Sequence, residues 1–83
     1  MSPLARFTLY SRPHCHLCER MLAELAGLPA AAAHPVDVLD VDQDPAMRAR
    51  YGHKIPVLLF GGELVCHGRL DPEEVHKALA TAR

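Results

Sequence analysis

Residues 8–18 read Thr-Leu-Tyr-Ser-Arg-Pro-His-Cys-His-Leu-Cys, and this stretch decides the fold. Upstream of the cysteines, apolar and polar side chains alternate, which predicts a β-strand over residues 5–10. Apolar side chains then recur with helical spacing, which predicts a helix over about residues 15–28. We therefore expect Cys15 and Cys18 where a strand passes through a short loop into the start of a helix.

The middle of the chain repeats this alternation of strand and helix. Residues 36–41 form a predicted strand that is apolar on both faces, as in a buried parallel strand. Asp44-Pro45 is typical of a helix start, because Asp caps free N–H groups and Pro fits the first turn. This short helix is expected to end near Tyr51, with Gly52 as its C-terminal cap.

The last third of the chain predicts a hairpin and a final helix. Strands over residues 57–60 and 63–66 flank a Gly-Gly turn signal. A second Asp-Pro pair, at residues 71–72, begins a helix that is expected to run to about residue 82. The order β-α-β-α-β-β-α predicts an α/β fold with a mixed four-stranded sheet and three helices, opened by a right-handed parallel crossover.

The composition sets limits on the class of protein. The 83 residues are 49% hydrophobic with a formal net charge of −1, which predicts a single domain over residues 1–83. Because charges are mixed along the chain, no nucleic-acid partner is expected. No apolar run approaches the roughly 18 residues of a membrane span, and no secretion signal is recognisable, so we expect a cytoplasmic location. Three cysteines, an odd number, argue against a secreted disulfide scaffold.

Cys15 is the predicted nucleophile. Free backbone N–H groups and the helix dipole stabilise an anion at a helix start. This effect, at most about 2 kcal/mol, lowers a thiol pKa by roughly one and a half units. Arg12, His14 and His16 are candidates for tuning the pKa of Cys15 further, although loop histidines at alternate positions are more often simply solvated. The thiolate is the form of cysteine that attacks a disulfide.

Cys18 is the predicted resolving thiol. It lies one helical turn after Cys15 in the apolar arc, where burial raises a thiol pKa. Cys15 would form a mixed disulfide with the substrate, and Cys18 would displace the product. Two alternatives stay open: a zinc or iron–sulfur module that uses the same two cysteines, or a non-catalytic interaction module. No metal site is expected from His14, because it is adjacent to Cys15, unlike the usual ligand spacings.

Cys66 ends the predicted fourth strand and has several interpretations. It is a candidate third redox thiol, a candidate for modification by glutathione, or a candidate metal ligand. A small buried residue is the simpler interpretation, because free cysteine is among the residue types most often buried.

Residues 8–18, 55–57 (Ile-Pro-Val) and 61–62 (Gly-Gly) resemble the glutaredoxin-like branch of the thioredoxin fold. The resemblance covers nearly the whole chain, because the order and lengths of the elements also agree. It implies a thioredoxin-like architecture and a thiol–disulfide oxidoreductase that holds no prosthetic group.

The resemblance also implies roles for residues distant from the cysteines. Pro56 would be the cis proline that faces the cysteine pair, and the backbone of Ile55 would pair with the substrate. Arg12 matches a basic residue that many glutaredoxins carry before the first cysteine; binding of an anionic substrate group and a solvated loop arginine are both open. Gly68 and Asp71 match two positions of a family pattern that binds the amino-acid end of glutathione.

The sequence departs from that family at two points. His16 and Leu17 replace the usual Pro-Tyr between the cysteines, so the tyrosine contact with glutathione is absent. Residues 67–71 keep only Gly68 and Asp71 of the glutathione pattern. Glutathione is therefore one expected co-substrate, and a flavoprotein reductase is the alternative electron donor. The expected substrate is a disulfide-containing protein or a glutathione mixed disulfide, and the chain is expected to be a monomer.

Overall fold

The computed structural model describes residues 5–81. Within that range the helices and strands follow the predicted order. They are β1 (Phe7–Ser11), α1 (His16–Ala26), β2 (Val36–Asp40), α2 (Pro45–Tyr51), β3 (Val57–Phe60), β4 (Glu63–His67) and α3 (Pro72–Thr81). Two single 3-10 turns follow α1 and β2, namely η1 (Pro29–Ala31) and η2 (Val41–Gln43).

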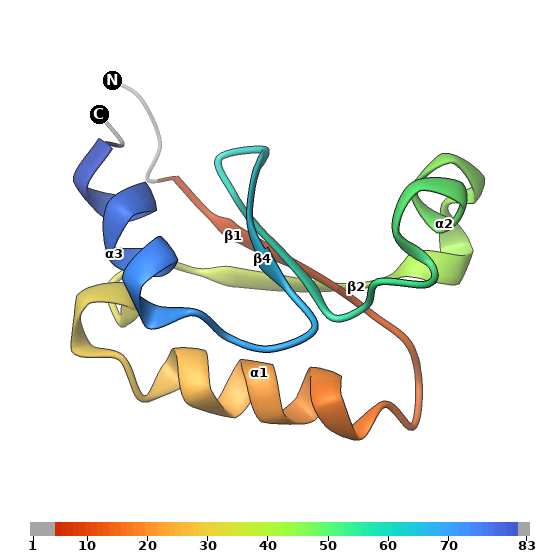
Figure 1. Ribbon diagram of the computed structural model, residues 1–83, viewed down its shortest axis with the longest axis horizontal. Helices are drawn as coiled ribbons and strands as arrows, with labels where there is room; N and C mark the ends of the chain where they lie inside the picture. The colour runs from red at the N-terminus through yellow and green to blue at the C-terminus, as the bar shows by residue number, and fades with distance from the viewer. Residues whose placement is uncertain (1–4, 82–83) are drawn as a thin grey trace.

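The strands form one mixed sheet in the order β2-β1-β3-β4. β1 is parallel to β2, and β3 is antiparallel to both β1 and β4. The register places Phe7 opposite Phe60 and Leu9 opposite Leu58. Since alternate side chains of a strand point to the same face, these four side chains share one face of the sheet. The loop that carries Cys15 therefore leaves the sheet from a central strand (Figure 1).

α1 and α3 pack on that face of the sheet. Met21 and Leu25 of α1 and Val75 of α3 are nearly fully buried in one cluster with the inward side chains of β1 and β3. Met21 and Leu25 reach the sheet together, because residues four apart share a face of a helix. This packing fixes the start of α1, and with it the cysteines, relative to β1 and β3.

α2 lies apart from the other helices, beyond the end of β2 (Figure 1). As predicted, Asp44 caps its start, and Oδ1 accepts hydrogen bonds from the backbone N–H groups of Ala46 (3.1 Å) and Met47 (3.2 Å). The ring of Tyr51 stacks on that of Tyr10, with 6.0 Å between the centroids. The C-terminal end of α2 is therefore held beside the end of β1.

The position of β2 differs from the prediction. It is an edge strand rather than a strand buried on both faces, and Val38 and Leu39 are 49% and 44% exposed. Asp37 of β2 forms a two-point ion pair with Arg6, at 2.7 and 2.8 Å, in an exposed setting. The valines and leucines of β2 indicated a strand, but hydropathy does not encode the order of strands in the sheet. Among the described residues, β1 is the one strand that pairs with β2.

Other boundaries shift slightly. β1 begins at Phe7 rather than at residue 5, and it extends to Ser11 because the parallel register continues to the pair Ser11–Asp40. α1 ends at Ala26, where Gly27 caps it. The predicted end of the last helix at residue 82 lies outside the described residues. Over residues 5–81, none of the helices has both the length and the apolar character needed to cross a membrane.

Candidate active site

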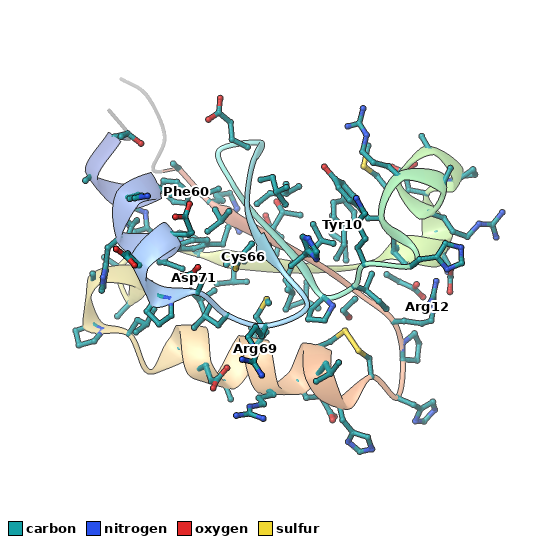
Figure 2. All side chains as sticks on the ribbon, in the orientation of Figure 1. Tyr10, Arg12, Phe60, Cys66, Arg69 and Asp71 are labelled. Atoms are coloured by element: carbon teal, nitrogen blue, oxygen red, sulfur yellow. A yellow bond between two sulfur atoms is a disulfide. The ribbon has the colours of Figure 1, made fainter. Side chains whose placement is uncertain are left out.

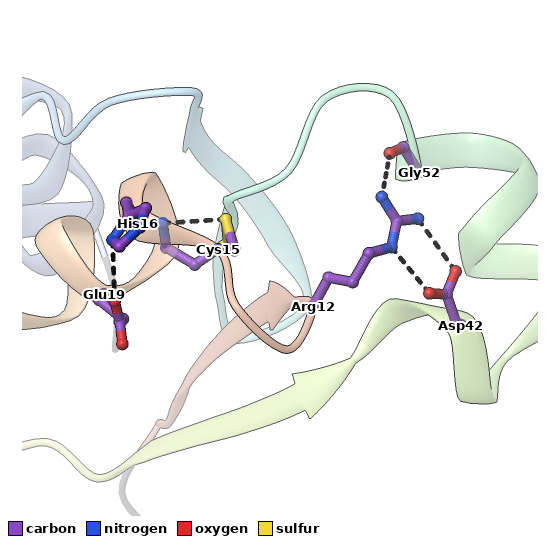
Figure 3. Close-up of a disulfide and its surroundings, with 7 residues drawn as sticks. Arg12, Cys15, His16, Glu19, Asp42 and Gly52 are labelled. Atoms are coloured by element: carbon purple, nitrogen blue, oxygen red, sulfur yellow. Dashed lines mark hydrogen bonds and ion pairs between the residues drawn. A yellow bond between two sulfur atoms is a disulfide. The ribbon is translucent and has the colours of Figure 1, made fainter.

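Cys15 and Cys18 form a disulfide at the start of α1 (Figure 3), with 5.2 Å between their Cα atoms. Cys15 is the N-cap of the helix and has extended backbone angles, φ −101° and ψ 103°. Its Sγ accepts a hydrogen bond from the backbone N–H of Cys18 at 3.2 Å. A sulfur atom thus occupies the place that a Ser or Asp oxygen takes at an ordinary N-cap.

The two cysteines differ in exposure, as predicted. Cys18 is 4% exposed and belongs to the core, whereas Cys15 is partly exposed at the helix end. The difference arises from the helix itself: Cys18, Met21 and Leu25 are its three buried residues, spaced three and four apart, while Cys15 precedes them. Reagents in solvent therefore reach Cys15 more readily than Cys18.

The loop before Cys15 turns sharply at His14, whose φ of 62° lies in the left-handed region. The imidazoles of His14 and His16 are both exposed, and His16 Nδ1 lies 3.6 Å from Glu19 Oε2. Within residues 5–81, neither imidazole forms a hydrogen bond with Cys15 Sγ. Their effect on Cys15 stays a prediction, which depends on proximity in the sequence alone.

The Ile55–Pro56 peptide bond is cis, as the resemblance implied. Pro56 is buried, and its carbonyl oxygen accepts a hydrogen bond from the N–H of Gly68 at 2.8 Å. Gly68 has φ 80°, a conformation that glycine adopts without strain. Pro56 and Gly68, which lie 12 residues apart in the sequence, are thus direct neighbours. Ile55 is half-buried, and among the described residues its backbone forms no hydrogen bond with another segment.

Asp71 has a structural role in this molecule. Its Oδ1 accepts hydrogen bonds from the backbone N–H groups of Glu73 (3.1 Å) and Glu74 (3.3 Å), which makes it the cap of α3. Figure 2 shows Asp71 at the start of α3, between that helix and the connection that carries Arg69. The substrate contact implied for Asp71 stays a prediction.

Arg12 has a partner that the sequence did not indicate. Its Nε and Nη2 donate to the two carboxylate oxygens of Asp42, at 2.7 and 2.9 Å, and Nη1 lies 3.4 Å from the carbonyl oxygen of Gly52. Hydrogen bonding with Arg12 lowers the pKa of Asp42, and the same bonds raise the pKa of Arg12. Figure 3 shows Arg12 pointing away from Cys15, toward η2 and the end of α2. The cation is therefore paired with Asp42 in this structure while it stays partly exposed, and its contact with an anionic substrate group stays a prediction.

Cys66 lies in β4 opposite Leu58 and is half-buried against the core. Burial raises the pKa of its thiol. This favours the interpretation of Cys66 as a small packing residue. Among residues 5–81, no three His, Cys, Asp or Glu side chains lie close enough together to bind a metal ion.

The sheet order, the Cys-x-x-Cys pair at the start of α1 and the cis proline before β3 together define a thioredoxin-like domain. The chain belongs to the glutaredoxin-like domain family (DUF836), which matches residues 6–80. This confirms the resemblance drawn from the sequence.

Relatives and solved structures agree with this assignment. An uncharacterized protein of Mycobacterium tuberculosis is 27% identical over 77 residues, which cover 87% of this chain and 79% of that protein. An uncharacterized protein of Mycobacterium bovis matches to the same extent. A Nitrosomonas europaea protein solved by solution NMR is similar with a TM-score of 0.80 and 26% identity, over 93% of each chain. An X. campestris protein solved by X-ray methods has a TM-score of 0.63 and 27% identity, over 93% of this chain and 99% of that one.

Proposed function

We propose that this protein is a thiol–disulfide oxidoreductase with Cys15 as nucleophile and Cys18 as resolving thiol. The observation that carries the proposal is the asymmetry of the pair: Cys15 is accessible at a helix N-terminus, and Cys18 is buried within disulfide distance of it. A purely structural disulfide has no need of a reachable sulfur at a site that stabilises a thiolate.

The exchange has two steps. The Cys15 thiolate attacks one sulfur of the substrate disulfide, an S–S bond forms between them, and the substrate bond breaks to release one thiolate. Cys18 then loses its proton and attacks Cys15 Sγ, which breaks the mixed disulfide and releases the second substrate thiol. The substrate gains two electrons and two protons, and the protein is left with the Cys15–Cys18 disulfide.

The start of α1 supports the charge on Cys15. The N–H of Cys18, which donates to Cys15 Sγ in the disulfide, is placed to donate to the same atom when it is a thiolate. Hydrogen bonds to a charged group are about twice as strong as neutral ones. The helix dipole adds about 0.3–2 kcal/mol in the same direction.

The family resemblance and the backbone of Ile55 support a proposal for the substrate and the electron donor. A disulfide-bearing segment would lie against the backbone of Ile55, whose N–H and C=O have no backbone partner among the described residues. The substrate is a disulfide-containing protein or a glutathione mixed disulfide. Glutathione or a flavoprotein reductase restores the dithiol, and the protein works as a cytoplasmic monomer without a bound cofactor.

The test is reduction of insulin, or of a glutathione mixed disulfide, by the purified protein with dithiothreitol or glutathione as reductant. We expect Cys15→Ser to abolish turnover and Cys18→Ser to accumulate the mixed disulfide, which mass spectrometry detects. Cys66→Ser serves as the matched control and is expected to keep full activity. Turnover that survives in Cys15→Ser would remove Cys15 as the nucleophile.

A further inference from the structure

A groove of about 580 Å³ lies between α1 and the connection from β4 to α3, and its lining includes Gly68, the residue that bonds to Pro56. Its apolar lining comes from Leu17, Met21 and Leu70. Leu17 lies between the two cysteines in the sequence, yet it is 55% exposed. A single exposed leucine is common on a protein surface, but this one lines a groove, where a bound polypeptide would cover it.

The charges of the groove do not balance. Arg20 and Glu24 lie one helical turn apart on α1 and pair at 3.5 Å, so they largely neutralise each other. Arg69 also lines the groove, and no carboxylate of residues 5–81 is within ion-pair distance of its guanidinium. Figure 2 shows Arg69 extending from the connection after β4 over α1. Beside Leu17 and Leu70, the groove therefore presents one guanidinium without a carboxylate partner among residues 5–81, together with the imidazole of His67.

We propose that this groove binds the polypeptide that flanks the substrate cysteine, and that it selects protein disulfides with apolar and acidic neighbours. An apolar side chain of the substrate covers Leu17, and a carboxylate beside it pairs with Arg69. The inference rests on the proposed function and names its substrate class. The chemical step is unchanged: Cys15 takes one substrate sulfur, and Cys18 releases it.

The size of the selection follows from the position of Arg69. Ion pairs at an exposed rim contribute about 0.2–1 kcal/mol, so a glutamate should speed the reaction up to about fivefold relative to a neutral residue. A lysine at the same place should slow it by a similar factor. The preference should shrink at high salt, because salt screens exposed charges.

The test uses two peptides that differ in one residue type. Each has a central cysteine in a mixed disulfide with 2-mercaptoethanol and is flanked by leucines, with glutamates in one peptide and lysines in the other. Pre-reduced protein is mixed with each peptide in a single turnover, and release of free peptide is followed by chromatography. We expect the glutamate peptide to react about tenfold faster than the lysine peptide, and Arg69→Glu to reverse the order.

Arg50→Glu is the matched control, because it makes the same charge change on α2, at an exposed residue that does not line the groove. It should leave the order of the two peptides as in the wild type. Equal rates for both peptides, with turnover still abolished by Cys15→Ser, would overturn this inference and leave the exchange chemistry standing. If neither peptide reacts, the proposed function fails and the groove assignment fails with it.

Discussion

At the scale of single residues, the three cysteines should separate by reactivity. Cys15 lies at a helix N-terminus, where the thiolate is stabilised, whereas burial raises the pKa of Cys66. In the reduced protein at pH 7 we expect iodoacetamide to modify Cys15 at least about tenfold faster than Cys66, since each pKa unit changes the thiolate fraction about tenfold in this range. Peptide mass spectrometry measures both rates at once. Faster labelling of Cys66 would contradict the assignment.

Asp71 gives a second prediction at this scale. Because its carboxylate caps α3, Asp71→Ala should lower the free energy of unfolding by about 1 kcal/mol, and Asp71→Asn by less. Urea unfolding measures the loss. The rate of exchange with a protein disulfide is expected to stay the same, because the carboxylate is already engaged by two backbone N–H groups. A fall in exchange rate at full folding would instead support the substrate contact that the resemblance implied.

At the scale of elements, the Arg12–Asp42 pair joins the loop before Cys15 to η2 and the end of α2. The pKa of Asp42 is lower in the folded protein than in the unfolded chain, so the pair stabilises the fold at neutral pH. We expect Asp42→Asn to be less stable than the wild type at pH 7. The difference should begin to shrink below about pH 4 and vanish at lower pH, once the native carboxylate is protonated.

Unfolding by urea across this pH range tests the pair. The variant Asp44→Asn is a useful control, because Asp44 lies in the same segment and caps α2, and no ion pair to it is found within residues 5–81. A stability difference between Asp42→Asn and the wild type that does not change with pH would show that the carboxylate charge is irrelevant. Because both side chains are about 38% exposed, the effect should also weaken with salt.

The elements themselves were largely predictable, and their relative positions less so. Asp-Pro pairs, the Gly-Gly turn and the apolar periodicities are local signals, so each predicted helix and strand is found within one or two residues at most described boundaries. The Arg12–Asp42 pair joins residues 30 apart in the sequence, and no local pattern encodes it. The edge position of β2 depends on the order of strands in the sheet. The groove beside Leu17 was not predicted either. It forms between two elements, because Leu17 lies on α1 and Arg69 lies on the connection from β4 to α3.

At the scale of the whole molecule, the site depends on a small core. β1, β3, α1 and α3 meet in one cluster, and that packing holds the inner side of α1. A domain of 83 residues buries a modest share of its surface, so its stability is a small difference between large terms. A substitution that weakens this core packing should therefore disturb the cysteines, even though neither cysteine is itself replaced.

Leu58 is the position that tests this dependence. It is fully buried at the centre of β3, opposite Leu9, and Leu58→Ala should lower the free energy of unfolding by about 2–5 kcal/mol. Leu64→Ala on β4 is the matched control; because Leu64 is 54% exposed, its loss should change stability by about 0.5 kcal/mol or less. Urea unfolding of the oxidised proteins measures both. The free energy of unfolding of such a domain is about 5–15 kcal/mol in total, so this loss is a large share of it. Leu58→Ala should therefore also raise the labelling rate of Cys18 in the reduced protein, because local opening exposes the buried thiol. Equal effects of the two substitutions would mean that the cluster does not hold the site in place.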